Sequence, residues 1–412
     1  SSYKRYTLRA NINSQLTNKI STFLNITGSY STAQNVDIPV DAPHSPIAHA
    51  TIWSPTVPVY NEDGSYVLKD PIGSAFNNPL ALTTEQLAVR ERMLANAIGG
   101  FKFDDIALPG LSLSIQYGAN YLEFQDNAFG GKAVGGGEAT AGITSNKQTK
   151  LQNTNILNYR RTFNGHSIDA TGVVEYSQTV SSYVAAGASK LTYENFLWNN
   201  LSQGTGNNPR SGYSKASIFS LVGRVNYGYR DRYLLSAAIR RDGSSKFVGK
   251  NKYSYFPSFS AGWVISQENF MQDQQFFSNL KLRASWGFTG SDGVGAYSTF
   301  SAYSTKNANF NNTTNTTGIA LGAIGNPDLK WETTEHQNLG LDVSLLKGRI
   351  TFSADYFVKN TRDLLLTEKL PIFLGENGIT RNVGSGQNKC WEFLLEGDII
   401  DRGAVTWNTG VN

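Results

Sequence analysis

The sequence predicts an all-β protein, a transmembrane antiparallel up-and-down β-barrel, and three observations support this fold. Apolar and polar residues alternate with a period of two in many segments, as in strands with one apolar and one polar face. Short turns alternate with long polar connections, which is typical of outer-membrane barrels. Of the 412 residues, 12% are aromatic and only 17% are charged. The sequence has no run of 18 apolar residues, so we expect no helix that spans a membrane.

About fourteen such strands are predicted. In the segment 280–288, Leu280, Leu282 and Ala284 share one face, whereas Lys281 and Arg283 share the other. A strand of this kind needs only about 9–11 residues to cross a membrane. The same pattern is clearest in four further segments, 111–121, 168–176, 221–229 and 350–358.

The connections differ in length at the two ends of the predicted strands. Short turns, expected on the periplasmic side, are 16–19, 106–110, 163–166, 230–232, 346–349 and 400–403. Long polar loops, expected on the extracellular side, are about 35–89, 126–149, 190–213, 291–330 and 361–389. Two connections depart from this rule: 247–252 is a short outer loop and 266–279 a long inner turn.

The segment 83–96 has helical propensity and begins with a threonine suited to a helix N-cap. It could be a short loop helix that leads into a strand, and its period leaves the two alternatives open.

Aromatic residues lie near predicted strand ends, where rings with polar tips suit a membrane interface. The alternative is that Tyr and Trp simply favour strands. The residues concerned are Tyr227, Tyr229, Tyr233, Trp263, Trp331, Trp391 and Trp407.

The charges exclude some classes of function. The 36 basic and 32 acidic residues are interspersed, so nucleic acid is not an expected partner. The single cysteine, Cys390, excludes an internal disulfide framework and a cysteine-based zinc site.

No catalytic or cofactor motif is recognisable. His44 and His49 are five residues apart but have no third ligand suitably spaced, and His166 and His336 are isolated. The acidic segments 61–64 and 242–245 lack a full set of calcium ligands and are interpreted as turns, and the glycines at 135–137 precede no helix. We therefore expect neither a cofactor nor an enzyme.

The polar strand faces are expected to line the barrel interior. Charges of both signs on this face require water or a polar plug beside them, which favours a wide lumen. The residues expected to point inward are Arg5, Arg9, Asn11, Asp169, Glu175, Arg224, Asn226, Arg240, Lys281, Arg283, Asp342, Asp355, Glu392, Glu396 and Asp398.

Several runs resemble the SusC/RagA family of TonB-dependent transporters from Bacteroidetes outer membranes. These runs occur in the same order as in members of the family, and together they are specific for this family. They are 4–11, 224–235, 240–247, 256–263, 280–287 and 326–334.

The resemblance implies a 22-stranded barrel in the outer membrane, with a plug domain inside it and a TonB-contacting segment before the plug. It also implies a SusD-like surface lipoprotein as a lid. Residues 1–412 would then be part of a single barrel domain cut at both ends, without the plug and the C-terminal strands. The implied function is TonB-dependent import of a large nutrient, a glycan or a peptide. The alternatives are a passive porin, a barrel enzyme and a soluble β-sandwich adhesin.

Five residues are candidates for substrate contacts. Trp53, Tyr60 and Tyr66 lie in the loop 35–89, where they could stack on sugars, pack on the lid or pack within the loop. Arg224 and Arg240 are expected to point into the lumen.

Overall fold

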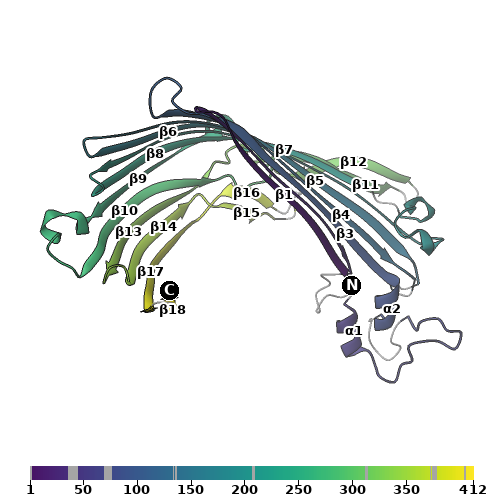
Figure 1. Ribbon diagram of the computed structural model, residues 1–412. Coiled ribbons are helices and arrows are strands. Elements are labelled where there is room, and N and C mark those ends of the chain that lie inside the picture. The colour runs from purple at the N-terminus through teal and green to yellow at the C-terminus, as the bar shows by residue number, and fades with distance from the viewer. Residues whose placement is uncertain are drawn as a thin grey trace.

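The structure is a computed structural model that describes residues 2–35, 45–68, 77–132, 134, 137–206, 209–310, 314–371, 373, 378–402 and 405–412. Its main feature is one arched antiparallel sheet of fourteen strands, in which each strand pairs with the next along the chain (Figure 1). The strands are β1 (Ser2–Thr17), β2 (Ile20–Gln34), β3 (Gln86–Phe103), β4 (Leu111–Gly130), β5 (Thr140–Phe163), β6 (His166–Ser189), β7 (Arg210–Tyr229), β8 (Tyr233–Ser244), β9 (Tyr253–Val264), β10 (Phe277–Ser291), β13 (Glu332–Leu345), β14 (Ile350–Arg362), β17 (Ser385–Arg402) and β18 (Val405–Val411). The expected all-β fold with about fourteen strands is confirmed.

The connections contain small elements of their own. Two short helices, α1 (Pro46–Ile52) and α2 (Pro79–Glu85), lie between β2 and β3. Two hairpins, β11 (Ala302–Phe310) with β12 (Thr314–Ala323) and β15 (Leu365–Lys369) with β16 (Gly378–Asn382), form separate two-stranded sheets. The 3₁₀ turns are η1 (Glu194–Phe196), η2 (Leu201–Gln203), η3 (Gly249–Lys252), η4 (Ile265–Gln267) and η5 (Asn269–Met271). No helix within the described ranges is long and apolar enough to cross a membrane.

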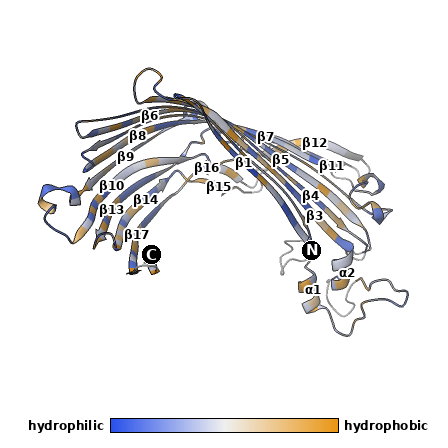
Figure 2. Ribbon diagram, viewed as in Figure 1, coloured by the Kyte–Doolittle hydropathy of each residue, from blue (hydrophilic) through white to orange (hydrophobic). Residues whose placement is uncertain are grey.

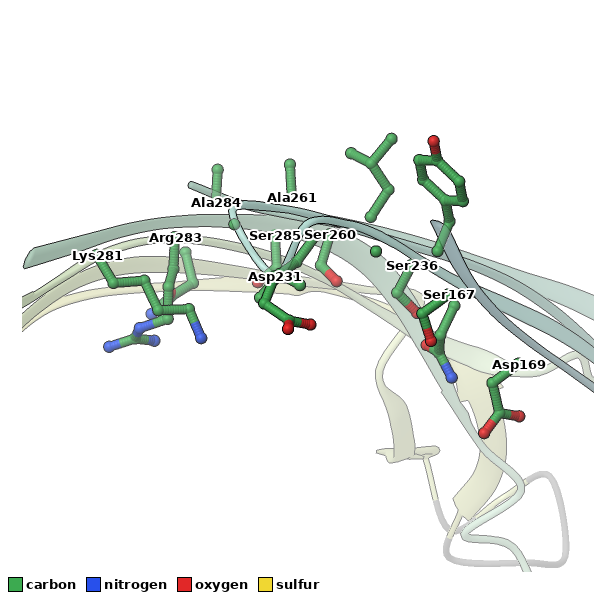
Figure 3. A pocket seen from close by; sticks show the side chains of 17 residues that line it. Ser167, Asp169, Asp231, Ser236, Ser260, Ala261, Lys281, Arg283, Ala284 and Ser285 are labelled. Atoms are coloured by element: carbon green, nitrogen blue, oxygen red, sulfur yellow. The ribbon is translucent and has the colours of Figure 1, made fainter. Parts of the chain in front are cut away.

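The two faces of the sheet differ in polarity as the alternation predicts. Leu282 lies opposite Leu341, and Ala284 opposite Leu339, so apolar side chains gather on one face. Hydropathy alternates along the strands (Figure 2). Ala261 and Ala284 point away from the concave side, whereas Lys281 and Arg283 point into it (Figure 3). The concave face is therefore the polar one.

Five of the short turns lie where the sequence predicts them. In the sixth, 400–403, residues 400–402 belong to β17 and pair with β18, and Gly403 lies outside the described residues. Asn164 and Gly165, which join β5 to β6, both have positive φ, at 46° and 80°. Two such residues form the tight turn that matches the twist of a hairpin. The two exceptions are also found: the β8–β9 connection is short, and the β9–β10 turn carries η4 and η5.

The predicted loops are longer than the observed ones in three places. β4 continues to Gly130 and β5 begins at Thr140, so most of 126–149 is strand. The predicted loops 291–330 and 361–389 each contain a hairpin. In 83–96, helix α2 ends at Glu85 and the remainder is strand, because β3 pairs with β4 along its full length and with β2 from Val89 onward. This pairing overrides a helical propensity that is worth a few tenths of a kcal/mol per residue.

Two buried clusters hold the outer ends of the strands and the loops together. The first cluster contains Phe129, Ala139, Ala141, Ala188 and Leu191. The second, which we call the rim cluster, contains Phe247, Phe256, Val294, Leu329 and Trp331. Both clusters pack loop residues against strand ends, so the outer loops are parts of the packed structure.

One of the aromatic assignments is wrong. Trp331 is only 6% exposed within the rim cluster and donates from Nε1 to the carbonyl of Lys252 at 3.3 Å, so it is not a membrane-interface residue. Trp391 lies within β17 on the apolar face, where its ring contacts Tyr356, and its place at the membrane interface stays a prediction. Local alternation cannot distinguish these environments, because both depend on packing across strands.

Strands β5 and β6 are the longest, with 24 residues each. At about 3.4 Å per residue each extends roughly 80 Å, far more than an apolar band about 25 Å tall requires. On the outer face of this extension the Lys147 ammonium lies 3.3 Å from Glu123, which also accepts a hydrogen bond from Tyr121. An ion pair here indicates that this part of the wall stands above the lipid.

Candidate functional site

The concave face carries networks of paired charges. Arg283 donates to Asp342 from Nε at 2.7 Å and from Nη2 at 2.8 Å, and also to Asp355 at 3.0 Å. Ser353 donates to Asp342, and Asn338 donates to Asp355. One guanidinium thus joins β10, β13 and β14 across the wall.

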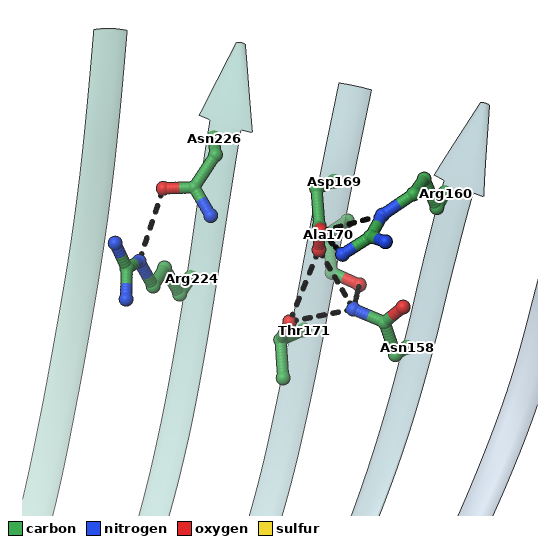
Figure 4. Close-up of polar contacts among 7 residues, drawn as sticks. All are labelled: Asn158, Arg160, Asp169, Ala170, Thr171, Arg224 and Asn226. Carbon is green, nitrogen blue, oxygen red and sulfur yellow. Dashed lines mark hydrogen bonds and ion pairs between the residues drawn. The ribbon is translucent and has the colours of Figure 1, made fainter. Parts of the chain in front are cut away.

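A second network lies on β5 and β6. Arg160 donates to Asp169 at 2.6 Å and 3.0 Å, and Asn158 bonds both Asp169 and Thr171 (Figure 4). Farther along β6, Glu175 accepts hydrogen bonds from Gln152 and Thr154 on β5. The charges that the sequence places on this face are therefore present, and these carboxylates are hydrogen-bonded.

The two candidate arginines differ in how much of their charge is neutralised. Arg240 is held by Asp242 through Nε at 2.7 Å and bonds Ser220 at 2.9 Å. Arg224 donates only to neutral groups, Asn226 at 3.0 Å and Ser236 at 3.4 Å, and its side chain is exposed (Figure 4). Among the described residues no carboxylate pairs with Arg224, so its charge remains available to an anionic ligand.

A recess of about 450 Å³ adjoins this wall, and Ser236, Ser260, Lys281, Arg283 and Ser285 border it on the concave side (Figure 3). Its small serine side chains leave space between the larger charged groups. Such a surface offers water and a polar cargo many weak hydrogen-bonding partners, without a single deep pocket.

The three loop aromatics do not join the arginines in one site. Tyr60 and Tyr66 stack on each other with centroids 5.2 Å apart, and the Tyr66 hydroxyl lies 3.0 Å from that of Thr84. Tyr60 is 49% exposed, so one ring of this pair is accessible. Trp53 follows α1, and its Nε1 is buried with no hydrogen-bond partner among the described residues.

Asn78 holds this loop in place. Its fully buried side chain caps α2 through the amides of Leu80 and Ala81, and donates to the carbonyls of Val59 and Val67. The position of the loop therefore depends on a buried amide that the sequence-based candidates did not include. The Asn-Pro pair at the start of α2 is the signal that could have identified it.

The acidic and histidine candidates have structural roles. Asp63 accepts two hydrogen bonds from Ser65, which lowers the pKa of its carboxyl, as expected for a turn residue. Asp242 is held by Arg240 at the outer end of β8, so the segment 242–245 is a strand end and not the predicted turn. His49 is buried and bonded to Asn77, whereas His44 and residues 135–136 lie outside the described residues. No group of three or more potential metal ligands occurs within the described ranges.

At the opposite end of the strands, Glu268 anchors the long β9–β10 turn. Its carboxylate accepts hydrogen bonds from the Tyr233 hydroxyl at 2.6 Å and Trp263 Nε1 at 3.0 Å, and pairs with Arg232 at 3.4 Å. These partners, the tyrosine hydroxyl first, lower the pKa of Glu268. The Glu268 carboxylate thus ties the β9–β10 turn to the inner ends of β8 and β9.

The lowered pKa of Glu268 makes the stability of this turn dependent on pH. A carboxyl with a depressed folded-state pKa stabilises the fold above its unfolded pKa, about 4.3, and this stabilisation is lost as pH falls through the folded value. We expect Glu268→Gln to lower the melting temperature slightly at pH 7, and this difference to shrink as the pH falls below the unfolded pKa and to vanish once it is below the lowered folded pKa of Glu268. Thermal unfolding of the full-length protein across pH measures this, and a gap that persists in acid would contradict it.

Comparison with known proteins identifies the class. The family model described as TonB dependent receptor-like, beta-barrel, matches residues 94–412. The TonB-dependent receptor P26 of Formosa agariphila is 33% identical over 99% of the chain, which covers 41% of that relative. The receptor SusC of Bacteroides thetaiotaomicron is 36% identical over 48% of the chain and 20% of its own length. The solved RagAB peptide transporter superposes with a TM-score of 0.83 at 21% identity, over 97% of this chain and 45% of the other.

The arched sheet, with its apolar convex face and polar concave face, is the wall of an outer-membrane β-barrel. The chain belongs to the TonB-dependent receptor family and is similar to its SusC/RagA-like members, which are transport proteins of the outer membrane and not enzymes. It spans about two fifths of the length of relatives such as P26.

Proposed function

We propose that this chain forms part of the barrel of an importer driven through TonB, which takes up a large nutrient, a glycan or a peptide. The observation that carries the proposal is the match to the TonB-dependent receptor barrel over residues 94–412, on a wall whose inner face is polar. A wall lined by hydrogen-bonded charges keeps water beside it, and a hydrated cargo can pass such a wall without losing its own hydrogen bonds.

The rest of the machinery belongs to the same proposal. A plug domain, a TonB-contacting segment and further strands that bring the barrel to about 22 would lie in other parts of the protein. A SusD-like surface lipoprotein would close the outer side. The similarity to SusC supports this partner, and the RagAB structure, that of a peptide transporter, supports peptides as one of the two substrate classes.

Within this proposal the five candidate residues have different roles. Arg224 is the best placed to meet an anionic group on the cargo, because its charge is not neutralised by a carboxylate. Tyr60 offers an accessible ring for a sugar or the lid, with Tyr66 behind it. Arg240 holds Asp242 and Trp53 packs within the loop, so both support the site indirectly.

Uptake by cells that carry the full-length protein tests the proposal. Labelled oligosaccharides and peptides are supplied with and without a protonophore, and in strains with and without the SusD-like surface lipoprotein. We expect uptake of at least one class to stop when the proton gradient collapses. Uptake that continues unchanged after the proton gradient collapses would instead indicate a passive porin. Uptake that is the same in strains without the lipoprotein would show that the lipoprotein is not a required partner.

The free charge of Arg224 gives a sharper expectation. Arg224→Gln removes a water-exposed, charge-assisted contact worth about 1 kcal/mol, so apparent affinity for an anionic cargo should fall about fivefold. Affinity for a neutral cargo of the same size should not change. Lys306→Gln, an exposed cation on β11, is the matched control. Equal losses for both cargoes would show that Arg224 acts through the fold and not through charge.

A further inference from the structure

The outer, convex face of β8 and β9 changes from apolar to cationic at one level. Below this level Leu235 lies opposite Ala261, and Ile239 opposite Pro257. The next outward pair is Arg241 with Tyr255. The stretch from Tyr233 to Arg241 is close to the roughly 9–11 residues with which a tilted strand crosses a membrane. Arg241 therefore lies at the outer boundary of the apolar band.

Aromatic rings and a second cation surround Arg241. Its guanidinium carbon lies 4.2 Å from the centroid of the Tyr253 ring and 5.7 Å from that of Tyr255. The Lys252 ammonium lies 5.9 Å from the same Tyr253 ring. Tyr253 and Tyr255 are 40% and 59% exposed, so the cluster faces outward, and Lys250 is exposed nearby on η3.

Within the described part of the chain, no carboxylate neutralises these cations. Arg241 Nε is buried and has no hydrogen-bond partner. Two acidic groups of this region are engaged elsewhere: Asp242 binds Arg240, and Asp292 binds Ser244 and Lys246. Asp328 is exposed beside η3, where its backbone carbonyl accepts a hydrogen bond from Asn251, and among the described residues it forms no ion pair with these cations. A buried, unpaired donor of a charged group is costly unless a ligand satisfies it.

We propose that Arg241, Lys250 and Lys252 bind the phosphate group of a lipid in the outer leaflet. A phosphate accepts hydrogen bonds from a guanidinium in a planar, bidentate manner, and two lysines add charge without a fixed geometry. The site is directly continuous with the apolar band, since the pair Ile239–Pro257 is next to the pair Arg241–Tyr255 on the same face. Acyl chains can therefore lie on Ile239 and Pro257 while the headgroup contacts the cations. This continuity favours a membrane-borne phosphate over a free one. The short β8–β9 connection leaves the site open to lipid from the side.

Native mass spectrometry of the full-length protein in mild detergent tests the site. The probe is phosphatidic acid, whose phosphate monoester is a net anion, and the reference is phosphatidylcholine, whose phosphodiester is neutralised by its own choline. We expect phosphatidic acid to be retained and phosphatidylcholine not. R241Q/K252Q should reduce the retained fraction severalfold, whereas R210Q/K306Q, which changes two exposed cations elsewhere, should not. R241K/K252R keeps both charges and should retain most of the binding, which guards against a folding defect in the first variant.

Two outcomes would overturn the proposal. Equal retention of phosphatidic acid by all variants would show that this cluster is not the site. Full displacement of the lipid by inorganic phosphate at the same concentration would show a free-anion site and not a lipid site. Neither measurement depends on import, so its result is separate from that of the uptake experiment.

Discussion

Trp331→Ala is expected to destabilise the outer rim by about 3–5 kcal/mol, the usual loss when a large buried aromatic is truncated. Trp331 is 6% exposed and packs against Phe247 and Phe256, with ring centroids 5.5 Å and 5.6 Å away. Its loss leaves a cavity among residues from β9, the β8–β9 connection and the segment before β13. We expect faster hydrogen exchange in the segment that joins β10 to β13, with the apolar band of the strands unaffected.

The control for this substitution is Tyr303→Ala on β11, in the same connection, where the side chain is 73% exposed. It should change stability by less than about 0.5 kcal/mol. If the segment that joins β10 to β13 shows the same rate of hydrogen exchange in both variants, the rim cluster does not anchor this segment.

Arg283→Met is expected to cost about 1–3 kcal/mol, because it leaves Asp342 and Asp355 without their shared cation. Breaking a buried ion pair typically costs 3–5 kcal/mol, and we reduce this figure because the Arg283 side chain is 32% exposed. The measurement is the free energy of unfolding of the full-length barrel in urea, reconstituted in lipid.

The triple variant, in which Asp342→Asn and Asp355→Asn accompany Arg283→Met, separates charge from packing. Removing both signs of charge should restore most of the lost stability, because no charge is then left unpaired. If the triple variant is as unstable as the single one, packing of the long arginine side chain matters more than its charge.

The sheet was predictable because alternation is a strong local signal. Segments such as 280–288 and 350–358 contain strict alternation, and both lie within strands with the expected faces. The orientation of Arg224 and Arg283 followed from the same period. The hydrogen-bonding partners of these arginines could not be predicted from the alternation, because register across strands is set by turns and bulges as well.

What the local pattern leaves open or misses has one physical origin, which is contact between segments that are distant in the sequence. For 83–96 the pattern leaves helix and strand open, and the structure has the short helix leading into a strand: α2 ends at Glu85, and hydrogen bonds to two neighbouring strands hold 86–96 in β3. Trp331 was assigned to the membrane interface because its packing partners come from distant segments, among them Phe247. The Glu268 and Asn78 anchors were missed for the same reason: each joins segments whose proximity only the fold creates.

The length of β5 and β6 has a consequence for how a cell presents this protein. Their outer halves stand beyond the lipid as a stiff collar, on whose outer surface Lys147 of β5 pairs with Glu123 of the neighbouring β4. A molecule that approaches from outside therefore meets a rigid β-structured surface at this level, and because side chains alternate between faces, substitutions on its outer face leave the inner face unchanged.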